Sequence, residues 1–285
     1  MNIRKITAVI TVTAMLAGMT GCFLKPNKLS PATLEKYAKK YGAEMYDNAA
    51  DFSFEYRSLY GDYYLISDGI SVRVKEGDVS KALEYADELS PYYDDCIEEA
   101  TIFAVGDSDD GYSVNVVAVA AEFGSEDEAA EYYDKIISIY TATPDLSEYF
   151  GSLDGYDLNS IFDFGDLFTM NDINDLFEAL DQYNVDFSGF EGIFDLFDVG
   201  VMEDVFNYNR YKYEEFEEGD IKYTLIIGDD IYVSGSDSKR FDSAGVYIDG
   251  NYVFFICGSA SERDLVDEYV DRICEGIGVE PPSSL

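Results

Sequence analysis

Histidine and tryptophan are both absent from this chain of 285 residues. Without an imidazole to act as base or ligand, the Ser-His-Asp and Cys-His catalytic groups and the histidine-containing zinc sites are excluded. Positive charge is also scarce, because 19 lysines and arginines stand against 58 aspartates and glutamates, a formal net charge of −39. Such a chain repels phosphate backbones, so we expect it to bind no nucleic acid.

Long apolar runs are missing after the N-terminus. Arg4 and Lys5 precede a run of 14 apolar or small residues, Ile6 to Met19. A helix needs roughly 20 such residues to cross a membrane, so this segment is typical of an export signal and not of a permanent span. The chain as a whole is 47% hydrophobic, which is enough to build a folded core.

The residues that follow the apolar run carry a family resemblance. Met19, Thr20, Gly21 and Cys22 resemble the lipobox of bacterial lipoproteins, although that family favours leucine at the position of Met19. The resemblance implies that residues 1–21 are a signal peptide, that Cys22 receives a diacylglycerol thioether, and that the protein is anchored on the outer face of the cell membrane. The alternative is an ordinary secretory signal with an incidental cysteine.

Basic residues gather next to this cysteine. From residue 46 to the C-terminus there are 56 acidic and 12 basic residues, whereas five lysines lie just after Cys22: Lys25, Lys28, Lys36, Lys39 and Lys40. We expect these lysines to attract anionic lipid headgroups, with the membrane as a partner. The alternative is that they only solvate one face of a helix.

Sequence periodicity predicts the first helix and the first strand. Ser30 and Pro31 are typical of a helix start, and an apolar stripe follows at three- and four-residue spacing: Leu34, Tyr37, Ala38, Tyr41 and Met45. Residues 63–74 favour one or two strands. Asp78 or Ser80 then caps a second helix, which Pro91 ends.

Two hairpin-then-helix units are predicted further on. In the first, runs at 100–105 and 112–123 flank an Asp-rich turn, and Ser125 to Glu128 is a capping box for a helix to about Tyr140. In the second, runs at 245–248 and 252–257 flank Asp249-Gly250, and Ser259 to Glu262 opens a final helix to about Gly276. The sequence therefore predicts an α+β fold, with an antiparallel sheet and helices packed on one face. The units are either related by duplication or alike by chance.

The chain divides into five parts. Residues 1–21 are the signal peptide, 22–30 a tether, 31–145 the first α+β part, 146–209 an acidic insertion rich in Phe, and 210–285 the second α+β part. Residues 136–209 contain no Lys or Arg. Their Phe and Leu content predicts short helices, notably at 171–181, which dock on the sheet or pair with another molecule.

Cysteine chemistry receives little support. With Cys22 lipidated, Cys96, Cys257 and Cys274 remain, so at most one internal disulfide can form. If Cys257 ends a strand and Cys274 lies on the helix that runs back over it, about 20 Å separates them, which is beyond disulfide reach. We expect small buried hydrophobic side chains and not reactive thiols.

Calcium is the one cofactor that the composition leaves open, because carboxylate oxygens are the abundant ligands. Asp107, Asp109 and Asp110 before Gly111 resemble half of a calcium loop, but the spacing of an EF-hand is not met. Turn chemistry explains these aspartates better than a metal does.

The missing catalytic residue types favour binding over catalysis. We expect an extracytoplasmic, membrane-anchored protein that binds a cationic or protein partner. One alternative is a cell-envelope hydrolase that uses carboxylate or thiol chemistry, although 58 acidic residues identify no particular pair. Another is that the acidity only keeps a surface protein soluble in salt.

Overall fold

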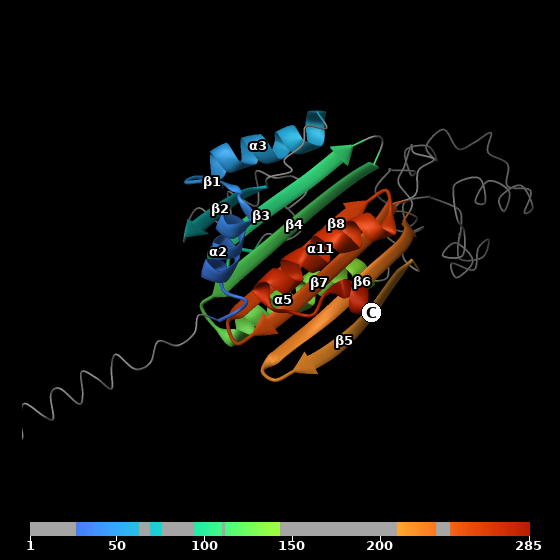
Figure 1. Ribbon diagram of the computed structural model, residues 1–285. Coiled ribbons are helices and arrows are strands. Elements are labelled where there is room, and N and C mark those ends of the chain that lie inside the picture. The colour runs from blue at the N-terminus through green and yellow to red at the C-terminus, as the bar shows by residue number, and fades with distance from the viewer. Residues whose placement is uncertain (1–26, 63–68, 76–93, 110–111, 143–209, 232–239) are drawn as a thin grey trace, which may run out of the picture.

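The computed structural model describes residues 27–62, 69–75, 94–109, 112–142, 210–231 and 240–285 (Figure 1). They form one sheet of eight strands with four α-helices packed against it, so the predicted α+β class is confirmed. The predicted signal peptide, Cys22, the predicted insertion at 146–209 and the helix expected after Asp78 lie outside the described residues.

The sheet joins the two predicted α+β parts into one layer, in the order β1-β2-β3-β4-β8-β7-β6-β5. Neighbouring strands are antiparallel except β1 and β2, which are parallel. The strands are β1 (Glu44–Tyr46), β2 (Ile70–Lys75), β3 (Ile97–Asp109), β4 (Tyr112–Phe123), β5 (Tyr211–Glu218), β6 (Ile221–Ile231), β7 (Arg240–Asp249) and β8 (Tyr252–Ala260). The predicted hairpins are β3–β4 and β7–β8, and they meet at the centre of the sheet through β4 and β8.

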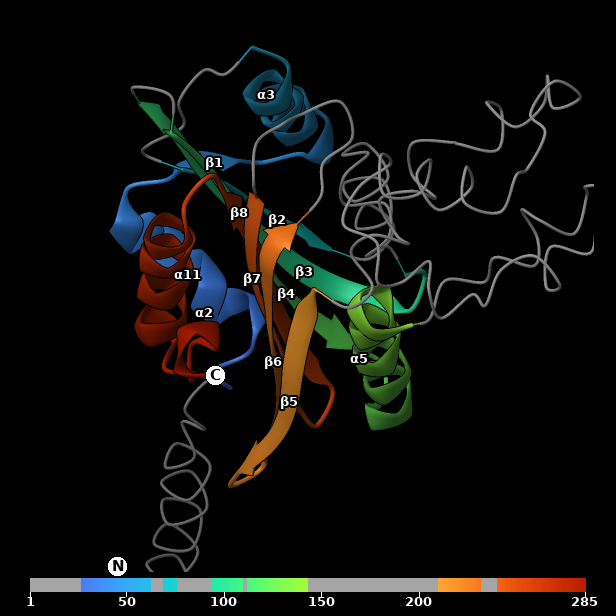
Figure 2. The ribbon, with the colours of Figure 1, turned by 90° about the vertical axis from the view of Figure 1, so that its right-hand side faces the viewer.

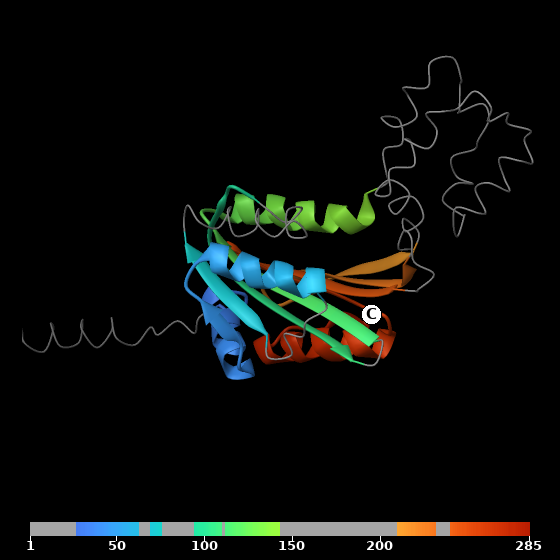
Figure 3. The same cartoon turned by 90° about the horizontal axis from the view of Figure 1, so that it is seen from above.

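The helices cover both faces of the sheet, not one face as the sequence pattern suggested (Figure 3). One face carries α2 and α11, and the other carries α3 and α5. The helices are α2 (Pro31–Tyr41), α3 (Ala49–Asp62), α5 (Glu126–Thr141) and α11 (Arg263–Ile277), and a short 3-10 turn, η4 (Pro282–Ser284), follows the last.

The central strands explain why two layers of helices are needed. In β4, Val117 and Val119 belong to the core beneath α5, while Val116 and Ala118 belong to the core beneath α11. Successive side chains of a strand point to opposite faces, so an unbroken apolar run is buried only if both faces are covered. The unbroken apolar run at 112–123 therefore indicates that both faces of the sheet are covered, although an antiparallel sheet more often has one solvated face.

The two hairpin–helix units share a chain order but not a packing arrangement. Helix α5 follows β4 and contacts β7, β8 and β4, whereas α11 follows β8 and contacts the same three strands from the opposite face. A two-fold axis through the antiparallel β4–β8 pair would put both helices on one face. The structure therefore gives no support to symmetrical duplication of the two units.

Local start and stop signals were mostly read correctly. Helix α2 begins at Pro31 after Ser30, and Gly42 ends it with a φ of 107°, so that Met45 lies in β1 and not on the helix. Ser125 caps α5 by accepting a hydrogen bond from the Glu128 amide at 3.3 Å, which confirms Ser125 as the predicted N-cap.

The predicted start of the final helix at Ser259 is wrong. Ser259 lies inside β8, and its hydroxyl donates to Asp242 Oδ1 at 2.8 Å instead of capping a helix. Helix α11 begins at Arg263 after Glu262, whose side chain makes no cap bond. The β7–β8 turn is also one residue later than expected, since Asp249 pairs with Tyr252 and leaves Gly250, with a φ of 59°, at the first turn position.

Candidate functional site

Of the residues predicted to meet the membrane, the structure describes four: Lys28, Lys36, Lys39 and Lys40. Cys22 and Lys25 precede the described residues, and Asn27 Nδ2 donates to Asp249 Oδ2 at 2.7 Å. Lys28 donates to the Gly278 carbonyl at 3.0 Å, next to the end of α11. The remaining three predicted lysines, Lys36, Lys39 and Lys40, are exposed on α2.

The aspartates considered for calcium do not form a metal site among the described residues. Asp107 accepts a hydrogen bond from the Tyr269 hydroxyl at 3.1 Å, and Asp109 pairs with Tyr112 in the β3–β4 ladder. Asp110 lies outside the described residues. Within those residues no group of three or more His, Cys, Asp or Glu side chains is placed to hold a metal ion.

The three described cysteines lack the features of a catalytic thiol. Cys257 contacts the core beneath α5 and Cys274 lies in the core beneath α11, which confirms that the pair cannot form a disulfide. Cys274 is buried, and burial raises the pKa of its thiol to about 12. Cys96 is exposed, contrary to the expectation of burial, and a hydrogen bond with Asp94 raises its pKa. A raised pKa leaves little of the nucleophilic thiolate.

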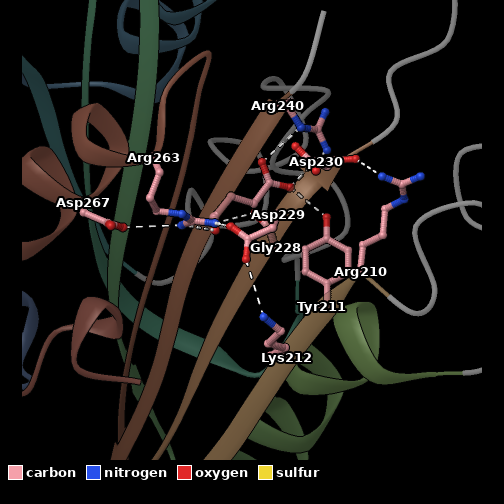
Figure 4. A network of polar contacts seen from close by, with 10 residues as sticks. Arg210, Tyr211, Lys212, Gly228, Asp229, Asp230, Arg240, Arg263 and Asp267 are labelled. Atoms are coloured by element: carbon pink, nitrogen blue, oxygen red, sulfur yellow. Dashed lines mark hydrogen bonds and ion pairs between the residues drawn. The ribbon is translucent and has the colours of Figure 1, made fainter. Parts of the chain in front are cut away.

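A buried carboxylate lies at the end of the sheet where β5 starts and β6 ends. Figure 4 shows side chains of this region, among them Tyr211, Arg240 and Arg263. Asp242, on β7, accepts hydrogen bonds from Tyr211 at 2.7 Å and from Ser259 at 2.8 Å. It also accepts from Arg240 Nη2 at 3.1 Å. Desolvation by burial, together with the charge of Asp242, raises the pKa of Tyr211, so the phenol remains a hydrogen-bond donor. This carboxylate has its charge balanced by Arg240 and its oxygens occupied.

Arg263, in the first turn of α11, connects the backbone of Asp242 to a bulge in β6. Its guanidinium donates to the Gly228 carbonyl at 2.5 Å, to Asp229 Oδ1 at 2.8 Å and to the Asp242 carbonyl at 2.9 Å. The register of β6 against β7 shifts between Gly228 and Ile231, so Arg263 donates to backbone oxygens at the edge of this irregularity. Asp230, within this shift, has a φ of 56°.

Arg263 and the groups bonded to it, which we call the Arg263 network, stabilise the fold and do not form an open site. Its acidic and basic side chains are paired with one another, since Asp267 also lies 3.4 Å from Arg263 and Lys212 lies 3.7 Å from Asp229. The network joins the ends of β6 and β7 to α11, across elements that are far apart in the sequence. No local sequence pattern marks these residues, because their partners come from four different elements.

An exposed acidic surface follows β5 toward its turn. Five of the seven residues at 214–220 are acidic: Glu214, Glu215, Glu217, Glu218 and Asp220. All five are exposed. Lys222 pairs with Glu215 at 2.8 Å, and the other carboxylates of this group have no ion pair with a described residue. We call these five side chains the acidic edge.

The acidic edge lies on the last strand of the sheet. In the strand order β5 has β6 on one side and no strand on the other, among the residues that the structure describes (Figure 2). Six of its eight residues are exposed, including Tyr213 at 56%. The strand therefore presents both negative side chains and a line of backbone donors and acceptors to its surroundings.

Comparisons with known proteins assign the chain to no family. No family model matches it, and no curated protein matches it in sequence. Among solved structures, the extracellular domain of PknH from Mycobacterium tuberculosis is similar at a TM-score of 0.31 and 9% identity, over 79% of this chain and 88% of that chain. No helix within the described segments is long and apolar enough to cross a membrane.

Proposed function

We propose that this chain is an extracytoplasmic lipoprotein whose folded part binds a cationic segment of a protein partner at the acidic edge. The anchor in this proposal is Cys22, supported by the basic, apolar and small-residue order of residues 1–22. The five lysines between Lys25 and Lys40 provide additional contact with anionic headgroups, and three of them are exposed on α2.

The observation that carries the binding role is the concentration of five exposed carboxylates at residues 214–220. Lys222 and Lys212 are the nearest basic residues in the sequence, and each pairs with a carboxylate, Glu215 and Asp229. The surface is therefore negative at short range as well as through the net charge of −39. Charge of one sign attracts a partner of the other sign, raises its association rate and rejects partners of like charge.

A charge reversal tests this proposal. The full soluble chain, starting at Phe23, is titrated with a capped ten-residue peptide in which pairs of Lys alternate with pairs of Val, and the Kd is measured by fluorescence anisotropy at low and high salt. The double variant Glu215→Lys, Glu217→Lys is expected to bind at least tenfold more weakly, since each lost contact between partly solvated charges contributes about 1 kcal/mol.

The matched control reverses two carboxylates at the other edge of the sheet. Glu44 and Asp47 are exposed in and after β1, and Glu44→Lys with Asp47→Lys changes the net charge by the same amount. This control is expected to bind within about twofold of the natural chain. An equal loss in both double variants would show that net charge alone attracts the peptide, and the acidic edge would no longer be a site.

A further inference from the structure

We infer that the partner binds as an added β-strand along the free edge of β5, and that its basic side chains then meet carboxylates on both faces of the sheet. This inference rests on the proposed function and adds the mode of binding. It follows from the position of β5 in the sheet, its register against β6 and the distribution of its side chains.

The register shows which backbone groups face outward. Glu218 pairs with Ile221 across a two-residue turn, so this pair is the hydrogen-bonded kind, and hydrogen-bonded pairs recur at every second residue of β5. The bond from the Asp229 amide to the Arg210 carbonyl, at 3.4 Å, fits the same alternation. Tyr213, Glu215 and Glu217 therefore direct their amide and carbonyl groups away from β6.

Three consecutive outward residues are enough to seat a short strand. Each of them offers one donor and one acceptor in the regular spacing of a sheet, and a fourth, Tyr211, continues the row at the end of the strand. Outward groups of this kind form the main-chain bonds in complexes where an extended peptide extends a sheet.

The side chains of β5 specify what the added strand carries. Tyr211 packs on the core beneath α5 and Phe216 on the core beneath α11, so odd-numbered side chains of β5 lie on the α5 face and even-numbered ones on the α11 face. Glu215 and Glu217 are thus on one face, while Glu214 and Glu218 are on the other. Residues directly opposite on neighbouring strands have Cβ atoms about 5 Å apart, so consecutive Lys or Arg residues of the partner each reach a carboxylate.

The same charges exclude a second copy of this chain as the occupant. Two β5 strands placed edge to edge would bring eight Glu side chains together, four from each copy, and like charges on an edge are a common protection against such pairing. The partner is therefore an extended basic segment of a different protein. Near Tyr213, its side chains meet an aromatic ring instead of a carboxylate.

A proline substitution separates strand addition from simple charge attraction. Tyr213→Pro removes the outward amide without changing any charge, and proline is tolerated on an edge strand whose amide faces away from the sheet. Tyr213→Val keeps the amide and removes the ring, so it is the matched control. With the Lys-Val peptide as probe, we expect the Kd to rise at least tenfold for Tyr213→Pro and to change less than threefold for Tyr213→Val.

Amide hydrogen exchange of the natural chain gives a second measurement that does not depend on how the proline variant folds. Saturation with the peptide is expected to slow exchange at Tyr213, Glu215 and Glu217 and to leave Glu214 and Phe216, already paired with β6, unchanged. Equal Kd values for the two Tyr213 variants, or no slowing at the outward amides, would overturn strand addition. The charge-reversal result would still decide the proposed function independently.

Discussion

Glu35 shows how a single, partly buried acidic residue joins two elements of the fold. It lies on α2 between Lys39, at 2.5 Å, and Arg73 of β2, at 2.8 Å. The hydrogen bond from Lys39 and the bond from Arg73 lower the pKa of Glu35, against a smaller opposing effect of burial. The residue thereby ties the first helix to the sheet.

Glu35→Gln is expected to lower the free energy of unfolding by about 1 kcal/mol at pH 7, because the glutamine keeps the shape but loses the charge. The folded-state pKa lies below the unfolded value of about 4.3, so this stabilisation is complete above that value and is lost as the pH falls through the folded-state pKa. Urea unfolding between pH 7 and pH 3 should show the difference shrinking toward zero.

The control for this measurement is Glu268→Gln. Glu268 pairs with Arg272 on the surface of α11, and its side chain is 61% exposed. Exposed pairs contribute little, so its effect is expected to stay within about 0.5 kcal/mol at every pH. A Glu35 effect that persisted at pH 3 would mean that shape, and not charge, accounts for it.

Residue-scale predictions succeeded where the partner is local. Ser125 and Ser259 both begin a Ser-x-x-Glu pattern, and only Ser125 is a helix cap. The amide that Ser125 binds is three residues away, whereas Ser259 pairs with Asp242 on the neighbouring strand. No local pattern reports such a partner, and the Arg263 network was missed for the same reason.

At the scale of elements, the crossing of α2 and α11 depends on a glycine. A Cβ atom added at Gly276 would overlap the ring of Tyr37, whose hydroxyl donates to the Arg272 carbonyl at 3.3 Å. The ring also packs edge-on against Phe103 of β3, with centroids 5.8 Å apart. The close contact between the two helices therefore requires the smallest residue at position 276.

Gly276→Ala is expected to destabilise the protein by about 1–3 kcal/mol, because overpacking outweighs the gain of about 1 kcal/mol that alanine normally gives inside a helix. Thermal unfolding followed by circular dichroism measures the change. In a Tyr37→Ala background the same substitution should become neutral or stabilising. Destabilisation of equal size in both backgrounds would refute the steric explanation.

Element prediction was successful for segments with strong periodicity or strong caps. The strands β3, β4, β7 and β8 and the helices α2, α5 and α11 all lie where the sequence predicted them, to within a few residues. Helix α3 and the β5–β6 hairpin were not predicted from the sequence. Six of the eight residues of β5 are exposed, so no alternation of apolar and polar residues marks it, although Gly219-Asp220 is a recognisable turn signal.

At the scale of the whole molecule, the contact of Asn27 with Asp249 determines which end of the sheet lies nearest the proposed anchor. Asn27 bonds to Asp249 beside the β7–β8 turn, and the β5–β6 turn lies at the same end of the sheet. Five residue steps separate Cys22 from Asn27, so at full extension this end lies within about 18 Å of the lipidated cysteine. The Arg263 network is at the opposite end.

A fluorescence measurement tests this orientation. A fluorophore is attached at Asp220→Cys or at Asp264→Cys, both exposed aspartates, in the lipidated chain carrying Cys96→Ser. We expect vesicles with nitroxide-labelled headgroups to quench the fluorophore at position 220 several-fold more strongly than the fluorophore at position 264. Position 264 lies at the far end of strands about 35 Å long. Cys22→Ser should abolish quenching at both positions. Stronger quenching at Asp264 would reverse the orientation.

The β4–β8 pair at the centre of the sheet also affects when the protein can fold. Glu122 pairs with Tyr252 and Val114 with Ala260, so the seam joins residues at least 130 positions apart. During synthesis, β4 therefore has no β8 to pair with until nearly the last segment has emerged. Contacts between residues so far apart in the sequence form slowly. For the exported protein proposed above, β4 and β8 would therefore pair only after the chain has crossed the membrane.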